Sequence, residues 1–359
     1  MSLIKVKSRG TDNVSGGRKN LVMNGAMKVS QRHGGSNGGT STEGYKLVDR
    51  WKFTQDQTSA TWNHTQSTDV PSGQGFAYSY KIAPGSADTS LASNCQLRLE
   101  HRWEGQDLQH LKKGTSSAES TTLSFWVKSV QTGTFVVNLQ DTDNSRLIAK
   151  TYTVNTTNTW EKKVIHFAGD TTGALTSDNN LSMVLHFYLS AGSDYTSGTL
   201  ATSWASITNA NRAAGQTVDL ASSTSNAFYL TGVQWEVGDS ASDFEHLSYG
   251  EELALCQRYY KRYDVGSDTA YSRLVVSTYS DTTSRFYVTM QLPVELRTTP
   301  TMAQSSLTLN GTAVTSISGI GGTQAMSFVF NHGASISTNN QYQVYGASGT
   351  GTLEFIAEL

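Results

Sequence analysis

The sequence predicts an all-β protein made of a jelly-roll β-sandwich, a short linker helix and a second, smaller β-sandwich domain. Proline is scarce at 4 residues and glycine is plentiful at 32, while Ser, Thr and Asn separate short aromatic and β-branched runs. Such a composition is typical of many short strands joined by polar turns. A chain of 359 residues is long for one β-sandwich and suggests two domains, since domains usually hold roughly 100 to 200 residues.

The first series of strand patterns lies in residues 20–245 and predicts the jelly roll. Residues 190–224 interrupt it with a long polar stretch in which Tyr195 and Trp204 are the only aromatic side chains. We expect a loop without regular structure there, of the kind that is usually functional or mobile. The predicted strands are residues 21–29, 48–54, 77–82, 96–100, 121–128, 133–140, 149–154, 161–167, 181–189 and 228–237.

The only convincing helix pattern follows the last of these strands and predicts a linker helix in residues 246–263. Ser248 and Glu251 have the spacing of a capping box, which starts a helix by pairing two backbone N–H groups with side chains. An apolar stripe at helical spacing should pack against one or both domains. It consists of Tyr249, Leu253, Cys256 and Tyr260.

A second, smaller β domain is expected in residues 264–359. Pro293 and Pro300 should end strands in it, because proline cannot donate a hydrogen bond to a sheet. The predicted strands are residues 270–278, 285–291, 302–309, 326–331, 342–345 and 352–359.

Two parts of the sequence resemble structural and tail-fibre proteins of tailed bacteriophages. GVQWEVG at residues 232–238, followed by SYGEELALCQRYY at residues 248–260, is similar to a segment common in those proteins. NLVMNGAM at residues 20–27, with the later pair Gln31-Arg32 and the triplet Asp49-Arg50-Trp51, resembles their opening. The resemblance implies that the framed domain is similar to jelly-roll carbohydrate-binding modules.

The resemblance further implies a non-enzymatic virion structural protein, a tail fibre or adhesion protein that contacts a host-surface polysaccharide. Its expected partners are other virion proteins and two further copies of itself in a homotrimer. Two alternatives stay open, a capsid fibre or decoration protein and a polysaccharide depolymerase. The depolymerase would need two carboxylates facing each other across a cleft.

The net charge and the lack of targeting signals indicate where the protein is made and which partners it has. The formal net charge of -2 gives no general attraction to nucleic acid or acidic membranes. The N-terminal residues lack the apolar core of a signal peptide, and no run approaches the ~20 apolar residues of a membrane span. We therefore expect synthesis in the host cytoplasm and a final place in the virion. Cys95 and Cys256 are expected to be buried free thiols in preference to a disulfide.

Residues 1–19 are basic and lack a periodic apolar face, which predicts an extended arm. Because the resemblance makes this end the attachment point, we expect it to dock onto the particle; the alternative is a frayed terminus. The basic residues of the arm are Lys5, Lys7, Arg9, Arg18 and Lys19.

The stretch that most resembles a binding site is HRWEGQD at residues 101–107. An indole face can stack on a pyranose while nearby polar groups bind its hydroxyls. The glycan-binding candidates are thus Trp103, Arg102, Glu104 and Asp107, but we favour the alternative of a loop anchored by a tryptophan against the sandwich. The strand patterns place Trp62, Trp126 and Trp160 in the core.

Cofactor and catalytic motifs are weak or missing. Asp141 and Asp143 alternate like the first half of a calcium loop, but the central glycine and closing glutamate of an EF-hand are missing. A structural calcium there is an alternative to a plain Asp/Asn turn, and we expect no other cofactor. The sequence has no Walker loop, dinucleotide fingerprint or H-E-x-x-H motif. These observations favour a protein that is not an enzyme.

Overall fold

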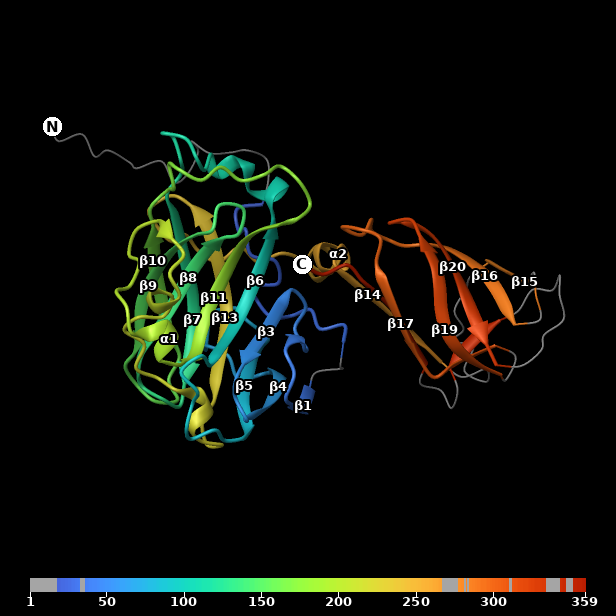
Figure 1. Cartoon of the computed structure of the whole chain (residues 1–359), viewed down its shortest axis with the longest axis horizontal. Coiled ribbons are helices and arrows are strands. Elements are labelled where there is room, and N and C mark those ends of the chain that lie inside the picture. Colours follow the sequence, from blue (N-terminus) through green and yellow to red (C-terminus); the bar gives the residue numbers. More distant parts are fainter. Residues whose placement is uncertain are drawn as a thin grey trace.

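The computed structural model of the chain describes residues 18–32, 36–266, 277–280, 282, 284–309, 312–333, 343–346 and 351–359. These residues form two β-rich lobes with helix α2 (Tyr249–Gln257) between them, as Figure 1 shows. The predicted all-β class is confirmed, since nearly all regular structure consists of antiparallel strands. No helix in the described part of the chain is long and apolar enough to cross a membrane.

The first domain is a sandwich of two antiparallel sheets, with its core between them. Trp51, Phe125, Phe187 and Trp235 belong to this core and are buried. The six-stranded sheet has the order β1 (Ser36–Thr40), β4 (Thr61–Ser67), β5 (Ser79–Ser86), β13 (Phe228–Val237), β7 (Thr121–Ser129), β10 (Glu161–Phe167). The seven-stranded sheet has the order β12 (Ala205–Ser206), β9 (Arg146–Val154), β8 (Gly133–Asp141), β11 (Leu181–Ala191), β6 (Gln96–Glu104), β3 (Trp51–Asp56), β2 (Gly44–Tyr45).

The tryptophans of the strand patterns do not all lie in the core. Trp62 is fully buried between the sheets, as predicted. Trp126 lies on β7 between the core residues Phe125 and Val127, so the alternation of a strand directs it to the outer face. Trp160 directly precedes β10 and is also half-buried. The prediction of core positions for Trp126 and Trp160 was therefore wrong.

The polar stretch 190–224 is structured and packed, contrary to expectation. It contains helix α1 (Ser193–Thr196), strand β12 and the 3-10 turns η2 (Asn209–Asn211) and η3 (Leu220–Ser222). Tyr195 packs against a cluster on the outer face of the seven-stranded sheet that includes Leu147 and Tyr188. The indole N–H of Trp204 donates to the carbonyl of Ala168 at 2.7 Å. The few apolar side chains of this stretch are therefore enough to pack it onto part of the outer face of that sheet.

Residues 21–29 form a series of turns where a strand was predicted. Asn24 and Met27 have φ values of 55° and 56°, which an extended strand does not allow. The Asn24 side chain stabilises the turn by donating to the carbonyls of Val29 and Asp49 at 2.8 and 2.9 Å. The apolar residues of this segment are buried without belonging to a sheet.

Helix α2 confirms the predicted capping box. The hydroxyl of Ser248 accepts from the N–H of Glu251 at 3.3 Å, and the Glu251 carboxylate accepts from the N–H of Ser248 at 2.9 Å. The helix is shorter than expected, because the chain enters β14 (Tyr260–Val265) at Tyr260. The predicted apolar stripe was partly wrong, since Tyr249 is 57% exposed while Cys256 is buried. Both cysteines are buried free thiols, as predicted.

The second domain also packs two antiparallel sheets around an aromatic core that includes Phe286, Phe328, Phe330 and Phe355. The three-stranded sheet has the order β14, β22 (Gly351–Ile356), β17 (Thr301–Ser305). The six-stranded sheet has the order β15 (Ser277–Ser280), β16 (Arg285–Gln291), β20 (Ala325–His332), β19 (Thr312–Gly321), β18 (Leu307–Leu309), β21 (Val344–Gly346). Strands β14 and β22 run side by side from the first domain into the second.

Strand prediction failed where sequence patterns were polar. Strand β4 reads TWNHTQS and β19 reads TAVTSISGIG, so both resemble turn-rich connections. Each forms because it pairs with a better strand, β4 with β5 and β19 with β20. Hydrogen bonds and side-chain contacts with the pairing strand stabilise these segments, whose own residues do not favour a strand.

Candidate functional site

The four residues predicted to bind glycan do not form one site. Trp103 is 1% exposed, and its indole N–H donates to the carbonyl of Leu21 at 2.7 Å. Its ring packs against Trp235 with 4.7 Å between the centroids. This placement agrees with the alternative of an anchoring tryptophan and leaves no free ring face for a sugar.

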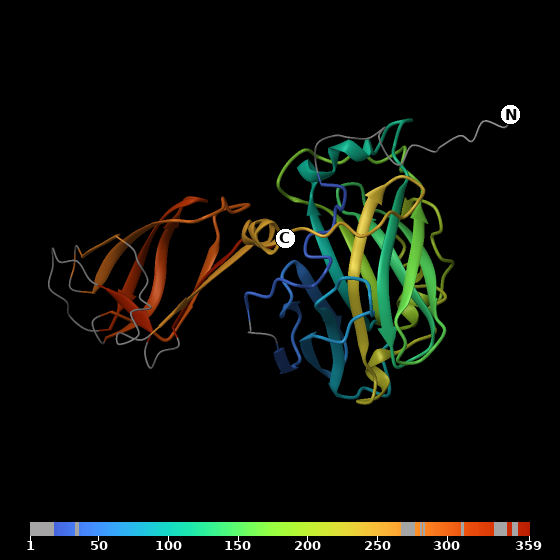
Figure 2. The ribbon, with the colours of Figure 1, turned by 180° about the vertical axis from the view of Figure 1, so that it is seen from behind.

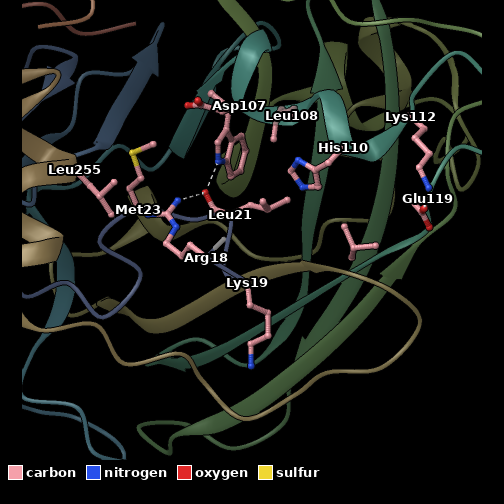
Figure 3. Close-up of a pocket in the computed structure, with 12 residues that line it drawn as sticks. Arg18, Lys19, Leu21, Met23, Asp107, Leu108, His110, Lys112, Glu119 and Leu255 are labelled. Carbon is pink, nitrogen blue, oxygen red and sulfur yellow. Dashed lines mark hydrogen bonds and ion pairs between the residues drawn. The ribbon is translucent and has the colours of Figure 1, made fainter. Parts of the chain in front are cut away.

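A pocket of about 780 Å³ lies beside Trp103 at one end of the sandwich. Asp107 and His110 reach it from the 3-10 turn η1 (Gly105–Leu111), and Arg18 and Lys19 lie across from them, as Figure 3 shows. The pocket therefore joins two predicted glycan residues, Asp107 and the buried Trp103, to two predicted docking residues. The other lining residues are Leu21, Met23, Trp103, Leu108, Lys112, Glu119, Val237 and Leu255.

The charged groups of the pocket are largely balanced. Lys112 forms an ion pair with Glu119 at 2.5 Å, and the ammonium of Lys19 donates to the carbonyl of Asp243 at 2.9 Å. Burial raises the pKa of Asp107, and the nearby Glu104 carboxylate raises it further. The pocket offers polar contacts of both signs and no concentrated charge. Its charge therefore does not indicate which class of ligand it would bind.

Arg102 and Glu104 point to the second domain and away from the pocket. Arg258, directly after helix α2, binds both carboxylate oxygens of Glu104 at 2.8 and 2.7 Å. Although burial opposes ionisation, these bonds lower the pKa of Glu104. Arg102 donates to the carbonyl of Leu359 at 2.8 Å. Both predicted glycan residues are therefore part of the contact between the domains.

Glu104 and Asp107 are also the nearest approach to a hydrolytic pair in this region. Their pKa values move apart, which is the pattern of an acid and a base sharing a site. However, the Glu104 side chain is fully buried and the guanidinium of Arg258 occupies both of its oxygens. A carboxylate held in this way is not free to attack a substrate or to take up a proton.

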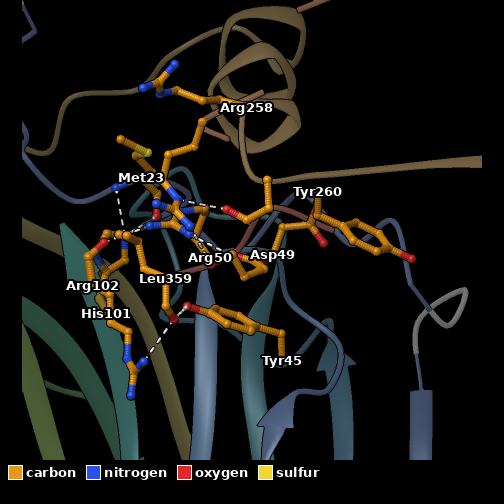
Figure 4. A network of polar contacts seen from close by, with 12 residues as sticks. Met23, Tyr45, Asp49, Arg50, His101, Arg102, Arg258, Tyr260 and Leu359 are labelled. Atoms are coloured by element: carbon orange, nitrogen blue, oxygen red, sulfur yellow. Dashed lines mark hydrogen bonds and ion pairs between the residues drawn. The ribbon is translucent and has the colours of Figure 1, made fainter. Parts of the chain in front are cut away.

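A buried polar network joins the two domains, and Glu358 is its centre. Arg32 and Arg50 of the first domain bind the two oxygens of Glu358 at 2.7 and 2.6 Å. The guanidinium of Arg50 also lies 3.3 Å from the centroid of Tyr259, and that of Arg32 lies 3.6 Å from Tyr260. Figure 4 shows Arg50, Arg102 and Tyr45 converging on the segment that ends at Leu359. We call this network the joint.

The residues of the phage-like motifs meet at the joint. The backbone N–H of Asn24 donates to the carboxylate of Glu252 in helix α2 at 2.5 Å. Gln31 donates to the carbonyl of Tyr260 at 2.9 Å and to the carboxylate of Asp49 at 2.5 Å. The two ends of the motif set, about 200 residues apart in sequence, thus assemble one structural element.

The calcium candidates Asp141 and Asp143 already have protein partners. The ammonium of Lys113 binds the carboxylates of both Asp141 and Asp170, and its distance to Asp170 is 2.8 Å. Asp143 accepts from the N–H of Thr176 at 2.8 Å. Among the described residues, no group of three His, Cys, Asp or Glu side chains is placed to hold a metal ion. Lys113 occupies the place that a cation would take beside Asp141.

The predicted docking arm is described only at its end. Lys5, Lys7 and Arg9 lie outside the described residues. Arg18 donates to the carbonyl of Leu21 at 3.1 Å, and the backbone N–H of Lys19 donates to Glu245 at 3.2 Å. These two residues contact the first domain itself.

The fold and the joint define a two-domain β protein whose first domain is a jelly-roll sandwich. No protein-family profile and no curated protein matches the chain. Among solved structures, a putative sugar-binding protein from Bacteroides thetaiotaomicron is 12% identical, with a TM-score of 0.32, over 61% of this chain and all of that one (100%). A family 11 carbohydrate-binding module of a Clostridium thermocellum cellulosomal cellulase is 11% identical, with a TM-score of 0.29, over 56% of this chain and 99% of that one.

The enzymatically active domain of tailspike protein 4 of bacteriophage CBA120 is also similar, at 12% identity and a TM-score of 0.29. The match covers 53% of this chain and 19% of the tailspike chain. We draw no functional conclusion from similarities at this level.

Proposed function

We propose that the chain is a non-enzymatic structural protein of a tailed-phage virion, a tail fibre or adhesion protein that contacts host-surface glycan. The observation that carries the proposal is the convergence of the phage-like motif residues on the joint. Asn24, Gln31 and Arg50 contact the segment around helix α2 and β14 instead of lining a cleft. Residues used in this way serve to fix the direction in which a second domain points.

A fixed direction is what a particle appendage requires. Buried ion pairs have geometric demands that a loose linker does not meet, because each charge must keep its partner. Glu358 meets two arginines of the first domain, and Arg297 of the second domain exchanges hydrogen bonds with Asn179 of the first at 2.8 and 2.7 Å. These contacts fix the position of the second domain relative to the first.

The non-enzymatic part of the proposal is supported by the state of Glu104. This carboxylate has a structural partner in Arg258 on both oxygens. A depolymerase would need two free carboxylates on opposite sides of a sugar. We propose the homotrimer and the docking of residues 1–19 on the particle from the sequence resemblance alone.

The proposal is tested on purified particles and purified protein. Antibody labelling of virions should place the chain on the tail, and the protein should adsorb to host cells without releasing reducing ends from their polysaccharide. Labelling of the capsid shell without adsorption to cells would favour the decoration protein. Release of reducing ends would overturn the non-enzymatic assignment, and absence from the virion would overturn the proposal as a whole.

A further inference from the structure

The outer face of the six-stranded sheet carries an aromatic and cationic surface that no predicted site included. We call it the outer aromatic face and define it by Trp126, Trp160, Tyr229, Lys81, Lys128 and Asp69. It lies on β5, β13 and β7 and at the start of β10; in Figure 2 strands β13 and β7 face the viewer. Residues 190–224 cover part of the outer surface of the opposite sheet. Residues 68–78 cover part of the outer surface of this one, where Thr231 donates to the carbonyl of Tyr78 and Thr231 and Lys128 are buried.

The sheet register aligns these side chains in a row across the strands. Tyr229 is paired with Lys81 on one side and with Lys128 on the other. The ammonium groups of these lysines lie 5.4 and 4.5 Å from the centroid of the Tyr229 ring. Trp160 meets Tyr229 edge to face, with 6.2 Å between the centroids and an interplanar angle of 71°.

Trp126 provides a second aromatic position next to this row. It lies on β7 two residues before Lys128, so the two side chains share a face about 7 Å apart. Its neighbours across the sheet are Thr231 and Lys162. Within the described part of the chain its indole N–H has no protein acceptor, and it is not among the buried unpaired polar atoms. A ligand can reach both the ring and the N–H.

Asp69 holds the row in place without neutralising it. It accepts from the indole N–H of Trp160 at 2.9 Å and forms an ion pair with Lys128. The face has this one carboxylate and two cations, Lys81 and Lys128, and Lys162 adds a third cation next to it, paired with Trp126 across the sheet. Lys162 is exposed and has no ion-pair partner among the described residues. The outer aromatic face therefore has an excess of positive charge.

From this geometry we infer that the outer aromatic face binds a carboxylated polysaccharide, with one sugar on Trp126 and a neighbouring acidic sugar beside Tyr229 and Lys81. Ring faces suit the apolar face of a pyranose, and ammonium groups suit its carboxylate. A neutral glycan would leave the cations without partners. The inference rests on the proposed glycan contact and names both its surface and its chemical class.

The test is binding of the full chain to oligogalacturonate, a carboxylated oligosaccharide, measured by calorimetry beside a neutral cello-oligosaccharide of equal length. We expect oligogalacturonate to bind at least tenfold more tightly at low salt, with affinity falling as salt rises. Trp126→Ala should weaken binding about tenfold, as loss of a central aromatic contact does. Lys81→Gln with Lys162→Gln should weaken it about fivefold and flatten the salt dependence.

Matched controls separate this surface from general effects. Tyr249→Ala removes an aromatic ring that is 57% exposed on helix α2, and Lys150→Gln removes a lysine of the opposite sheet. Neither should change binding, and Trp126→Phe should keep most of it. Unchanged thermal melting of each variant shows that the sandwich is intact.

Each contrary outcome has a distinct meaning. Equal affinity for the neutral oligosaccharide, or glycan binding that survives both the tryptophan and the lysine changes, overturns this inference while leaving the proposed glycan contact in place. Tight binding of single-stranded DNA that depends on the same residues would identify a nucleic-acid surface and also overturn it. If the protein binds neither these oligosaccharides nor host cells, the glycan part of the proposed function fails with it.

Discussion

The joint and the outer aromatic face use the same three kinds of group, a cation, an aromatic ring and a carboxylate. At the joint, Arg50 lies 3.3 Å from the Tyr259 ring and 2.6 Å from Glu358, with its side chain 0% exposed. On the outer aromatic face, Lys128 lies 4.5 Å from the Tyr229 ring and pairs with Asp69, whose side chain is 43% exposed. The Lys128 side chain is itself only 11% exposed, so the two regions differ in the carboxylate, which is 7% exposed at the joint. The burial of the carboxylate therefore separates a group that locks a structure from one that remains open to a ligand.

The pKa shifts at the joint and on the outer aromatic face differ in the same way. Burial on its own lowers the pKa of Arg50, but Tyr259 and Glu358 beside it raise that pKa above its usual range. Removing one partner of a buried pair leaves a desolvated charge, which is costly. On the outer aromatic face burial on its own raises the pKa of Asp69, but the hydrogen bonds from Lys128 and Trp160 lower it below its usual value. Water screens the loss of either partner there, because the carboxylate is 43% exposed. Substitutions should therefore have large effects at the joint and small ones on the outer face.

The largest effect is expected from Glu358→Gln, which leaves Arg50 without its carboxylate. We expect a loss of about 3–5 kcal/mol in the coupling between the domains. In calorimetry a single unfolding transition should divide into two, and small-angle scattering should show a wider range of domain separations. Asp264→Asn is the matched control, because its pair with Arg262 has a carboxylate that is 77% exposed. Equal behaviour of the two variants would contradict the joint as a lock.

A second prediction concerns acid. Burial lowers the pKa of His64 to about 3 from its usual 6.5. The unfolded chain then binds a proton below pH 6.5 that the folded chain does not, so stability is present above pH 6.5 and falls as the pH drops towards 3. From pH 6.5 to 5 this one group should cost roughly 2 kcal/mol. His64→Gln should flatten that slope in denaturant titrations, and an unchanged slope would contradict the assignment.

Arg258→Met should weaken the joint by about 1–3 kcal/mol, since the arginine is partly exposed but its partner Glu104 is buried. The substitution should also reverse the sign with which the stabilisation from Glu104 depends on pH. Arg258 lowers the pKa of Glu104 in the native protein, so its stabilisation exists above the unfolded pKa and is lost as the pH falls. Without Arg258 the buried carboxyl should favour its neutral form, and stability should rise as the pH is lowered from 7 to 5. Denaturation curves at both values test the sign.

The smallest effect on stability is expected from Asp69→Asn. The carboxylate of Asp69 is 43% exposed, so water can replace it beside Lys128, and the free energy of unfolding should change by less than about 1 kcal/mol. The change should nevertheless release Trp160, whose N–H donates to Asp69. A red shift of tryptophan fluorescence without a change in melting temperature would meet this expectation. A loss as large as that of Glu358→Gln would remove the contrast between the two regions.

Local sequence patterns predicted what depends on neighbours in the chain. Ser248 and Glu251 identified the start of helix α2 because a capping box needs only four residues. Alternation identified β10 and β13 with their observed bounds. The turn at residues 21–29 was missed because its positive φ at Asn24 is stabilised by Asp49, a partner distant in sequence.

The site residues were harder to predict, since exposure depends on which sheet face is covered. Trp103 lies outside the predicted strand of residues 96–100 and Trp126 lies inside that of residues 121–128, yet the first is buried and the second faces outward. The signal that separates them is alternation with the flanking core residues, Phe125 and Val127 for Trp126. Glu104 looked like part of a sugar site because its partner Arg258 lies more than a hundred residues away.

The second domain meets the first through two neighbouring strands. Strand β14 leaves the first domain, and β22 returns to it. A pull on the second domain would therefore be shared in parallel by the covalent chain at Tyr260 and by the ion pairs of Glu358. Neither connection can stretch far alone, because Tyr260 and Ile356 are paired across the two strands. Two short connections side by side resist bending and twisting better than one flexible tether. With both connections in place, a force on one domain would reach the other together with its direction.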